Sequence, residues 1–163
     1  MADPGPPLHP LLEPLAWLLG EWHGAGGGRY PSLDPFEFRM ELSGSHLGTP
    51  RLVLIQRTWR LDGDAPGTAS HLEAGYLRVG DDGLLEFLVA TGSGIAEQAE
   101  GRLEGMRLTL LSRQAVMAPS AARVDAVRRI WELDGDVLRY EVDMAALGEP
   151  MQFHLAAQLR RLG

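Results

Sequence analysis

The sequence predicts an all-β protein: a closed antiparallel barrel of ten strands preceded by one short helix. Stretches rich in apolar residues recur from Gly20 to the C-terminus, and no long helical period interrupts them. Gly, Asp and Pro turn signals separate these stretches, as in a meander of antiparallel strands. A single open sheet of so many strands would leave long exposed edges, which closure into a barrel removes.

The chain begins with a proline-rich segment, residues 1–9, which we expect to be a flexible lead-in. A short helix is expected over residues 10–19, where Leu11, Leu15, Leu18 and Leu19 share one face at α-helical spacing. Residues 10–163 are expected to form a single domain, of which this helix closes one end.

The strands are expected in ten stretches, four of whose junctions carry acidic residues followed by glycine. Asp-Gly sequences favour the positive φ angles of tight hairpin turns. The stretches are 20–28, 35–45, 51–61, 69–79, 83–91, 94–103, 106–117, 123–133, 137–146 and 150–161. The junctions are Asp62-Gly63-Asp64, Asp81-Asp82-Gly83, Glu104-Gly105 and Asp134-Gly135-Asp136.

The last stretch has an alternative as a helix, because residues 151–161 include good helix formers. Apolar residues nevertheless alternate strictly with polar or small ones there, and a period of two favours a strand. This alternation places His154 on the face of Gln152, Ala156 and Gln158, away from Phe153 and Leu155.

Composition excludes several kinds of chemistry. The 163 residues include 22 acidic and 15 basic side chains and no cysteine, and every basic one is arginine. The chain therefore has no thiolate metal site, cysteine nucleophile, Schiff-base lysine or P-loop lysine. A net charge of −7 argues against nucleic-acid binding. The first residues contain no basic signal-peptide region, and the apolar stretch after them is too short to cross a bilayer, so we expect a cytoplasmic protein without a membrane partner.

Local motifs for catalysis are weak. The glycine-rich segment 24–28 is followed by two nearby prolines rather than by a helix start, which rules out a dinucleotide loop. The five histidines form no HExxH or HxH pair. A barrel of this strand number is too wide for side chains alone to fill, so it tends to hold a ligand. Without cysteine, a bound haem could be held only by His, Met or Tyr.

An ordered series of short motifs resembles the nitrobindin family from about residue 14 to 161. The series opens with G-x-W-x-G-x-G at Gly20, Trp22, Gly24 and Gly26 and continues with Arg29-Tyr30-Pro31-Ser32. It goes on through His46-Leu47-Gly48, Gln56-Arg57-Thr58-Trp59, His71, Glu73, Gly75-Tyr76-Leu77-Arg78, Leu133-Asp134-Gly135-Asp136, Met144-Ala145, Pro150 and His154-Leu155.

The resemblance implies a closed ten-stranded barrel, related to fatty-acid-binding proteins, that holds one ferric haem b. It implies conversion of peroxynitrite to nitrate, together with nitric oxide binding. His154 matches the family's axial histidine, and Ser32 matches a threonine that lies against the haem. Trp22 is expected either to line the haem pocket or to anchor the barrel floor. Arg129, or its neighbour Arg128, is the expected cation for a haem propionate, since adjacent strand residues point to opposite faces.

Two other functions remain compatible with the same residues. The first is a non-enzymatic carrier or sensor of haem or nitric oxide. The second is a lipocalin-like binder of a small hydrophobic molecule. The sequence leaves homodimer formation open.

Overall fold

The computed structural model describes residues 5–62 and 67–163 and contains one short helix followed by ten strands. The helix, η1, is a 3₁₀ helix over Pro10–Leu18. The strands are β1 (Gly20–Tyr30), β2 (Leu33–His46), β3 (Arg51–Arg60), β4 (Ala69–Val79), β5 (Leu85–Thr91), β6 (Ile95–Glu104), β7 (Arg107–Met117), β8 (Val124–Asp134), β9 (Val137–Ala146) and β10 (Gln152–Arg161). All ten predicted strands are confirmed, with ends that differ by a few residues.

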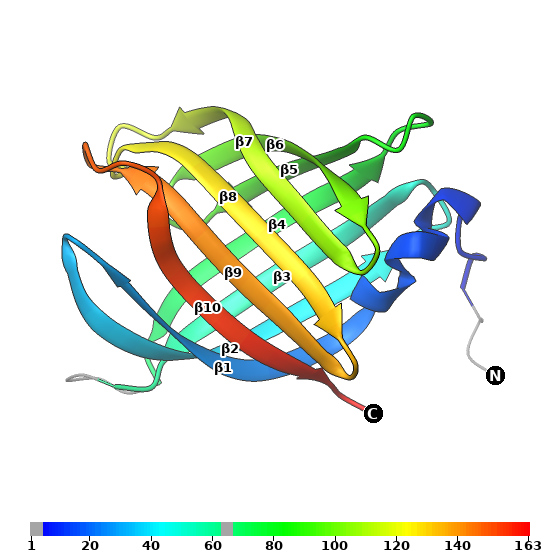
Figure 1. Cartoon of the computed structure of the whole chain (residues 1–163), viewed down its shortest axis with the longest axis horizontal. Coiled ribbons are helices and arrows are strands. Elements are labelled where there is room, and N and C mark those ends of the chain that lie inside the picture. Colours follow the sequence, from blue (N-terminus) through cyan, green and yellow to red (C-terminus); the bar gives the residue numbers. More distant parts are fainter. Residues whose placement is uncertain (1–4, 63–66) are drawn as a thin grey trace.

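Each strand pairs with its neighbours in sequence, and β1 also pairs with β10, which closes the barrel (Figure 1). In the closing pair Gly24 lies opposite Leu159 and Gly28 opposite Leu155. The predicted closed antiparallel barrel is therefore confirmed.

Three of the predicted hairpin turns owe their shape to glycine. Gly83, Gly105 and Gly135 have φ angles of 77°, 60° and 62°, in the left-handed region that favours this residue. The fourth turn, Asp62-Gly63-Asp64, lies partly outside the described residues.

The helix closes one end of the barrel, but with a different apolar face from the one expected. Leu12, Leu15 and Leu18 are buried, whereas Leu11 and Leu19 are only half-buried. A 3₁₀ helix has three residues per turn, so positions three apart share a face. Pro14 within the helix, which has no backbone N–H to donate, is compatible with this tighter, short helix. The expected spacing was wrong because it assumed α-helical periodicity.

The core fills the barrel from the helical end. Trp22, Leu42 and Trp131 are among its fully buried side chains. The closed end depends on Gly44, where a Cβ atom would lie 2.0 Å from the carbonyl oxygen of Leu18. Of the helices in the described residues, none is long and apolar enough to cross a membrane.

Candidate functional site

A cavity of about 400 Å³ occupies the end of the barrel opposite η1. Its lining comes from eight strands, β2, β3, β4, β5, β6, β8, β9 and β10, from the β5–β6 turn and from the β7–β8 loop. Much of this lining is apolar and suits a flat, hydrophobic ligand. The apolar residues of the wall are Leu33, Phe36, Phe38, Ile95, Ala122, Val124, Val127, Val142, Met144 and Leu155.

His154 projects into this cavity because β10 contains a β-bulge. The register between β10 and β9 shifts between Phe153 and Leu155, which face Asp143 and Val142. A bulge adds a residue to one strand and changes which way its side chains point. His154 and Leu155 consequently both line the cavity. The outward orientation expected from strict alternation was therefore wrong.

The ring of His154 is held by three neighbours from β1 and β2. Its Nδ1 lies 3.3 Å from the carbonyl oxygen of Arg29. Tyr30 packs edge-on at 5.5 Å between ring centroids, and Phe36 packs at 6.0 Å. A carbonyl only accepts, so Nδ1 carries the hydrogen and donates it. The lone pair of the neutral ring is then at Nε2, the arrangement that orients a histidine for metal binding.

The environment of His154 also favours the neutral ring. Burial lowers its pKa, an effect to which nearby His71 adds and which the hydrogen bond to Arg29 opposes. A neutral imidazole is the form that binds a metal. Within the described ranges, no group of three or more His, Cys, Asp or Glu side chains could hold a metal ion.

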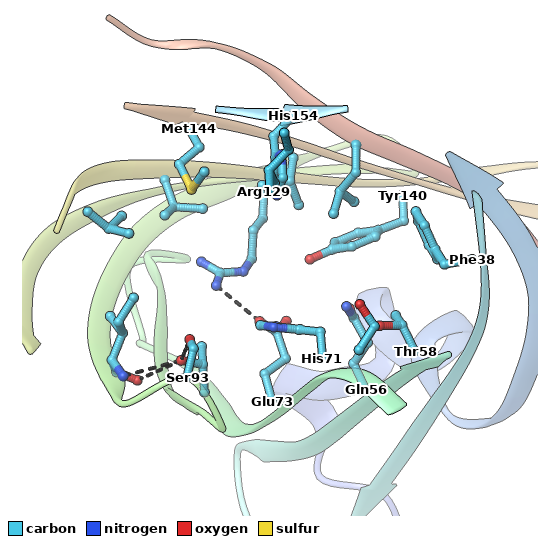
Figure 2. A pocket seen from close by; sticks show the side chains of 18 of the residues that line it. Phe38, Gln56, Thr58, His71, Glu73, Ser93, Arg129, Tyr140, Met144 and His154 are labelled. Carbon is cyan, nitrogen blue, oxygen red and sulfur yellow. Dashed lines mark hydrogen bonds and ion pairs between the residues drawn. The ribbon is translucent and has the colours of Figure 1, made fainter. Parts of the chain in front are cut away.

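Deeper in the cavity lies a buried cluster of one arginine between two carboxylates. The Arg129 guanidinium donates from Nη1 and Nη2 to the two carboxylate oxygens of Glu97, at 3.0 and 2.9 Å. Its Nη2 also donates to Oε2 of Glu73, at 3.1 Å (Figure 2). Ser112 donates a further hydrogen bond to Glu97, at 3.0 Å. All three charged side chains are at most 5% exposed. We call Glu73, Glu97 and Arg129 the arginine cluster.

Within the arginine cluster, each charged group keeps its neighbours in the ionised form. Burial alone would raise the pKa of Glu73, but Arg129 and His71 outweigh it and lower that pKa to about 2. Burial would likewise lower the pKa of Arg129, and the carboxylates raise it well above its usual value. Burial and Glu73 raise the pKa of the nearby Tyr140 phenol, which therefore stays protonated.

The arginine cluster corrects the expectation for Arg129. This residue does line the cavity, but its guanidinium charge is already paired with two buried carboxylates, so it is a poor partner for a propionate. Arg128 is half-exposed and pairs with Asp143. Among the cavity-lining residues that the structure describes, the other arginine is Arg60. Its guanidinium lies 5.0 Å from the ring centre of Phe36 and 3.0 Å from a carboxylate oxygen of Asp62.

Two further expected site residues do not line the cavity. Trp22 is buried in the core, with the guanidinium of Arg161 stacked 4.6 Å from its ring, so the structure favours the floor-anchoring alternative. Ser32 is exposed in the turn between β1 and β2, beside the lining residue Leu33. Of the four expected cofactor-binding residues, the structure brings only His154 and Arg129 to the cavity wall.

Comparisons with known proteins identify the family. Residues 11–161 match the family described as THAP4-like, heme-binding beta-barrel domain. The chain belongs to this family. Peroxynitrite isomerase 2 of Mycobacterium ulcerans is 42% identical over 158 residues, which cover 94% of this chain and 96% of that protein. Peroxynitrite isomerase of Streptomyces griseus is 42% identical over 163 residues, which cover 98% of this chain and 87% of that protein.

A solved structure agrees with the family assignment. The crystal structure of Rv2717c from M. tuberculosis superposes with a TM-score of 0.87 at 40% identity, over 96% of this chain and all of that one. The resemblance to nitrobindins expected from the sequence is thereby confirmed.

The glycines of the G-x-W-x-G-x-G motif make room for β10, the strand that carries His154. A Cβ atom at Gly24 would lie 1.9 Å from the carbonyl oxygen of Gln158, and one at Gly26 would lie 2.1 Å from that of Ala156. Both obstacles are backbone atoms of β10, so neither position can hold a larger residue unless β10 shifts. The motif therefore lets β10 lie close against β1.

The residues present fit a haem. One cavity-facing histidine with a free Nε2 is sufficient where a porphyrin supplies the other iron ligands. Aromatic and aliphatic side chains provide an apolar wall for the macrocycle, and Arg60 provides a cation on the same wall.

Sequence inspection missed the acidic members of the arginine cluster and their neighbour His71. The alternation of inward-facing and outward-facing residues along β4 could have revealed them. Glu73, Gly75 and Leu77 are buried, whereas Leu72 and Tyr76 are exposed. Following the buried face back from Leu77 leads to Glu73 and then to His71.

Proposed function

We propose that the chain binds one haem b per chain in the ferric state and isomerises peroxynitrite to nitrate. The observation that carries the proposal is the geometry of His154, which lines the cavity and whose Nδ1 is bonded to the Arg29 carbonyl, so that the lone pair of the neutral ring is at Nε2. The relatives named peroxynitrite isomerase support the choice of reaction.

His154 is the residue that would hold the iron. Its hydrogen bond to Arg29 sets the tautomer, and contacts with Tyr30 and Phe36 fix the ring orientation. Tyr30 is itself fixed, because its hydroxyl accepts a hydrogen bond from the Ala146 amide at 2.9 Å. The proximal side is therefore held by β1, β2 and β9 as well as by β10.

Arg60 replaces Arg129 as the proposed partner of a propionate. It lines the cavity and lies against Phe36, which in turn contacts His154. A guanidinium can bind a carboxylate through two parallel hydrogen bonds. Exchange of Asp62 for a propionate would keep the charge of Arg60 paired.

When bound, haem supplies an iron centre with an open coordination position for the peroxynitrite anion. The side chains of Val124, Val127 and Val142 exclude water from the enclosed part of the cavity. The same apolar side chains would confine the ligand beside the haem and keep other reactants out. Nitric oxide, a small uncharged molecule, suits the same enclosure.

The direct test is the yield of nitrate relative to nitrite when peroxynitrite decays in the presence of the haem-loaded protein. We expect faster decay and more nitrate than in buffer, with His23→Ala as a matched control outside the cavity lining. If haem binds and nitrate yield stays at the buffer value, the protein is a carrier or sensor. If a fatty-acid probe binds and haem does not, it is a binder of small hydrophobic molecules.

A further inference from the structure

Met144 is a cavity-lining residue whose sulfur atom the proposed function leaves unused. Tyr140, Val142 and Met144 are spaced two apart along β9, so their side chains point to the same side of the strand, and all three line the cavity. Figure 2 shows the Met144 side chain pointing into the cavity with its sulfur atom. The thioether is therefore open to a molecule that enters the site.

The surroundings of Met144 combine an apolar wall with the histidine of β10. On β8, Met144 lies opposite Val127, another cavity-lining residue. On β10 it lies opposite Gln152, two residues before His154. A change in the polarity of the Met144 side chain would thus alter the wall beside the residue that is proposed to hold the iron.

Among the residues that the structure describes, no other sulfur atom lines the cavity. The chain has no cysteine. Met40 is fully buried in the core, and the sulfur of Met117 accepts a hydrogen bond from a backbone amide. Met106 and Met151 are 44% and 37% exposed and lie outside the cavity lining. Within this part of the chain, an oxidant in the cavity meets a single thioether, that of Met144.

A thioether can take up one oxygen atom and become a sulfoxide. The proposed substrate, peroxynitrite, carries such an atom at the end of its O–O bond. A sulfur lone pair attacks the terminal oxygen, the sulfur–oxygen bond forms, and the O–O bond breaks and leaves its electron pair on the departing nitrite. Sulfur loses two electrons and peroxynitrite gains them. Sulfoxide and nitrite account for every atom and for the single negative charge, so no further reactant is needed.

We propose that Met144 is an oxidation site, at which peroxynitrite converts the thioether to a sulfoxide that weakens haem binding. The inference rests on the proposed function, which brings this oxidant into the cavity. The sulfoxide is polar and lies in an apolar wall, where a polar group without a partner is costly to bury. Each such event yields nitrite in place of nitrate and leaves a protein that holds its cofactor less tightly.

The first test is peptide mass spectrometry of the haem-loaded protein after treatment with less than one equivalent of peroxynitrite. We expect more sulfoxide at Met144 than at Met106. Exposure alone predicts the reverse, since Met106 is one of the exposed large apolar residues and Met144 is half-buried. Sulfoxide at Met106 equal to or above that at Met144 would overturn the proposal. Failure of the proposed function is distinguishable, because it is measured by the nitrate yield of the same sample.

The second test measures haem affinity before and after treatment with excess peroxynitrite. Wild type should bind haem about tenfold more weakly after treatment, because of the buried polar group. Met144→Leu, which keeps the wall apolar and has no sulfur, should retain its affinity, and the matched control Met106→Leu should behave as wild type. Equal losses in wild type and Met144→Leu would overturn the effect on haem binding.

A third variant separates the polarity of the sulfoxide from other oxidative damage. Met144→Gln places a polar group of similar length in the same wall without any oxidant. We expect its haem affinity to resemble that of oxidised wild type rather than that of Met144→Leu. An untreated Met144→Gln protein that binds haem as tightly as wild type would contradict the proposed cause.

Discussion

The two ends of the barrel use the same strands for opposite purposes. At the closed end, Leu12, Leu15, Leu18 and Trp22 form an apolar plug with 2% exposure or less. At the open end the interior holds the arginine cluster and an open cavity. Burial of apolar surface stabilises the first region, whereas the second pairs charges whose desolvation is costly.

This difference indicates where stability and ligand binding are located. Buried ion pairs stabilise a fold little compared with apolar residues of similar volume, but the loss of one partner is strongly destabilising. The charged residues at the open end are therefore better explained by the side chains that they hold in position than by a gain in stability. Substitutions at the closed end should change stability and leave haem binding intact, and substitutions at the open end should affect both.

Arg129→Met should have the largest effect, because it leaves Glu73 and Glu97 buried without a cation. We expect a loss of about 3–5 kcal/mol in the free energy of unfolding, measured by urea denaturation. The control is the triple variant Glu73→Gln, Glu97→Gln and Arg129→Met, which removes every charge and should regain much of the loss. No recovery in the triple variant would contradict the assignment of the loss to unpaired charge.

Leu15→Ala should destabilise the closed end by about 2–5 kcal/mol, since it leaves a cavity beneath η1. Leu15 is 2% exposed and does not line the cavity. Haem affinity, measured by titration well below the unfolding temperature, should match wild type. A large fall in affinity would contradict the independence of the two ends.

Gly26→Ala should lower the free energy of unfolding by about 1–3 kcal/mol. It should also disturb the haem site, because both effects act through β10. The new methyl group would lie 2.1 Å from the Ala156 carbonyl, so β10 must shift, and His154 with it. Gly27→Ala is the matched control, because its methyl group would meet only the Phe36 carbonyl, at 3.3 Å. The expected result is weaker haem binding in Gly26→Ala than in Gly27→Ala.

Low pH should destabilise the folded protein, because Glu73 becomes protonated. Its pKa is about 2 in the folded protein and 4.5 as an ordinary side chain, so the unfolded chain takes up the proton first as pH falls. The stabilisation is complete above about pH 4.5 and is lost progressively as pH falls towards 2. Melting temperatures over this range should fall more steeply for wild type than for Glu73→Gln, and parallel curves would contradict this account.

The sequence was sufficient for most of the fold, because turn glycines and apolar alternation are local signals. Gly83, Gly105 and Gly135 mark hairpins that the structure contains. Helix propensity and the assumed α-helical spacing of the leucines predicted the wrong apolar face for η1. In so short a segment, the local sequence does not distinguish an α-helix from a 3₁₀ helix.

The site was less accessible from the sequence because it depends on non-local geometry. The bulge at His154 reverses the orientation that alternation predicts, and it becomes visible only in the pairing with β9. The inward orientation of Arg129 was one of two that the sequence allowed. Its partners Glu73 and Glu97 lie 56 and 32 residues away in the chain, so nothing in the sequence indicated the pairing. The family resemblance located His154 without explaining how it reaches the cavity.

The most direct test of the central claim is a haem titration of the apoprotein with wild type, His154→Ala and the control His23→Ala. We expect a Soret band that saturates at one haem per chain in wild type and in His23→Ala. In His154→Ala the band should shift and the affinity should fall by more than about 100-fold, beyond the effect of losing a partner that merely orients a ligand. A Soret band of unchanged position and affinity in His154→Ala would contradict the account.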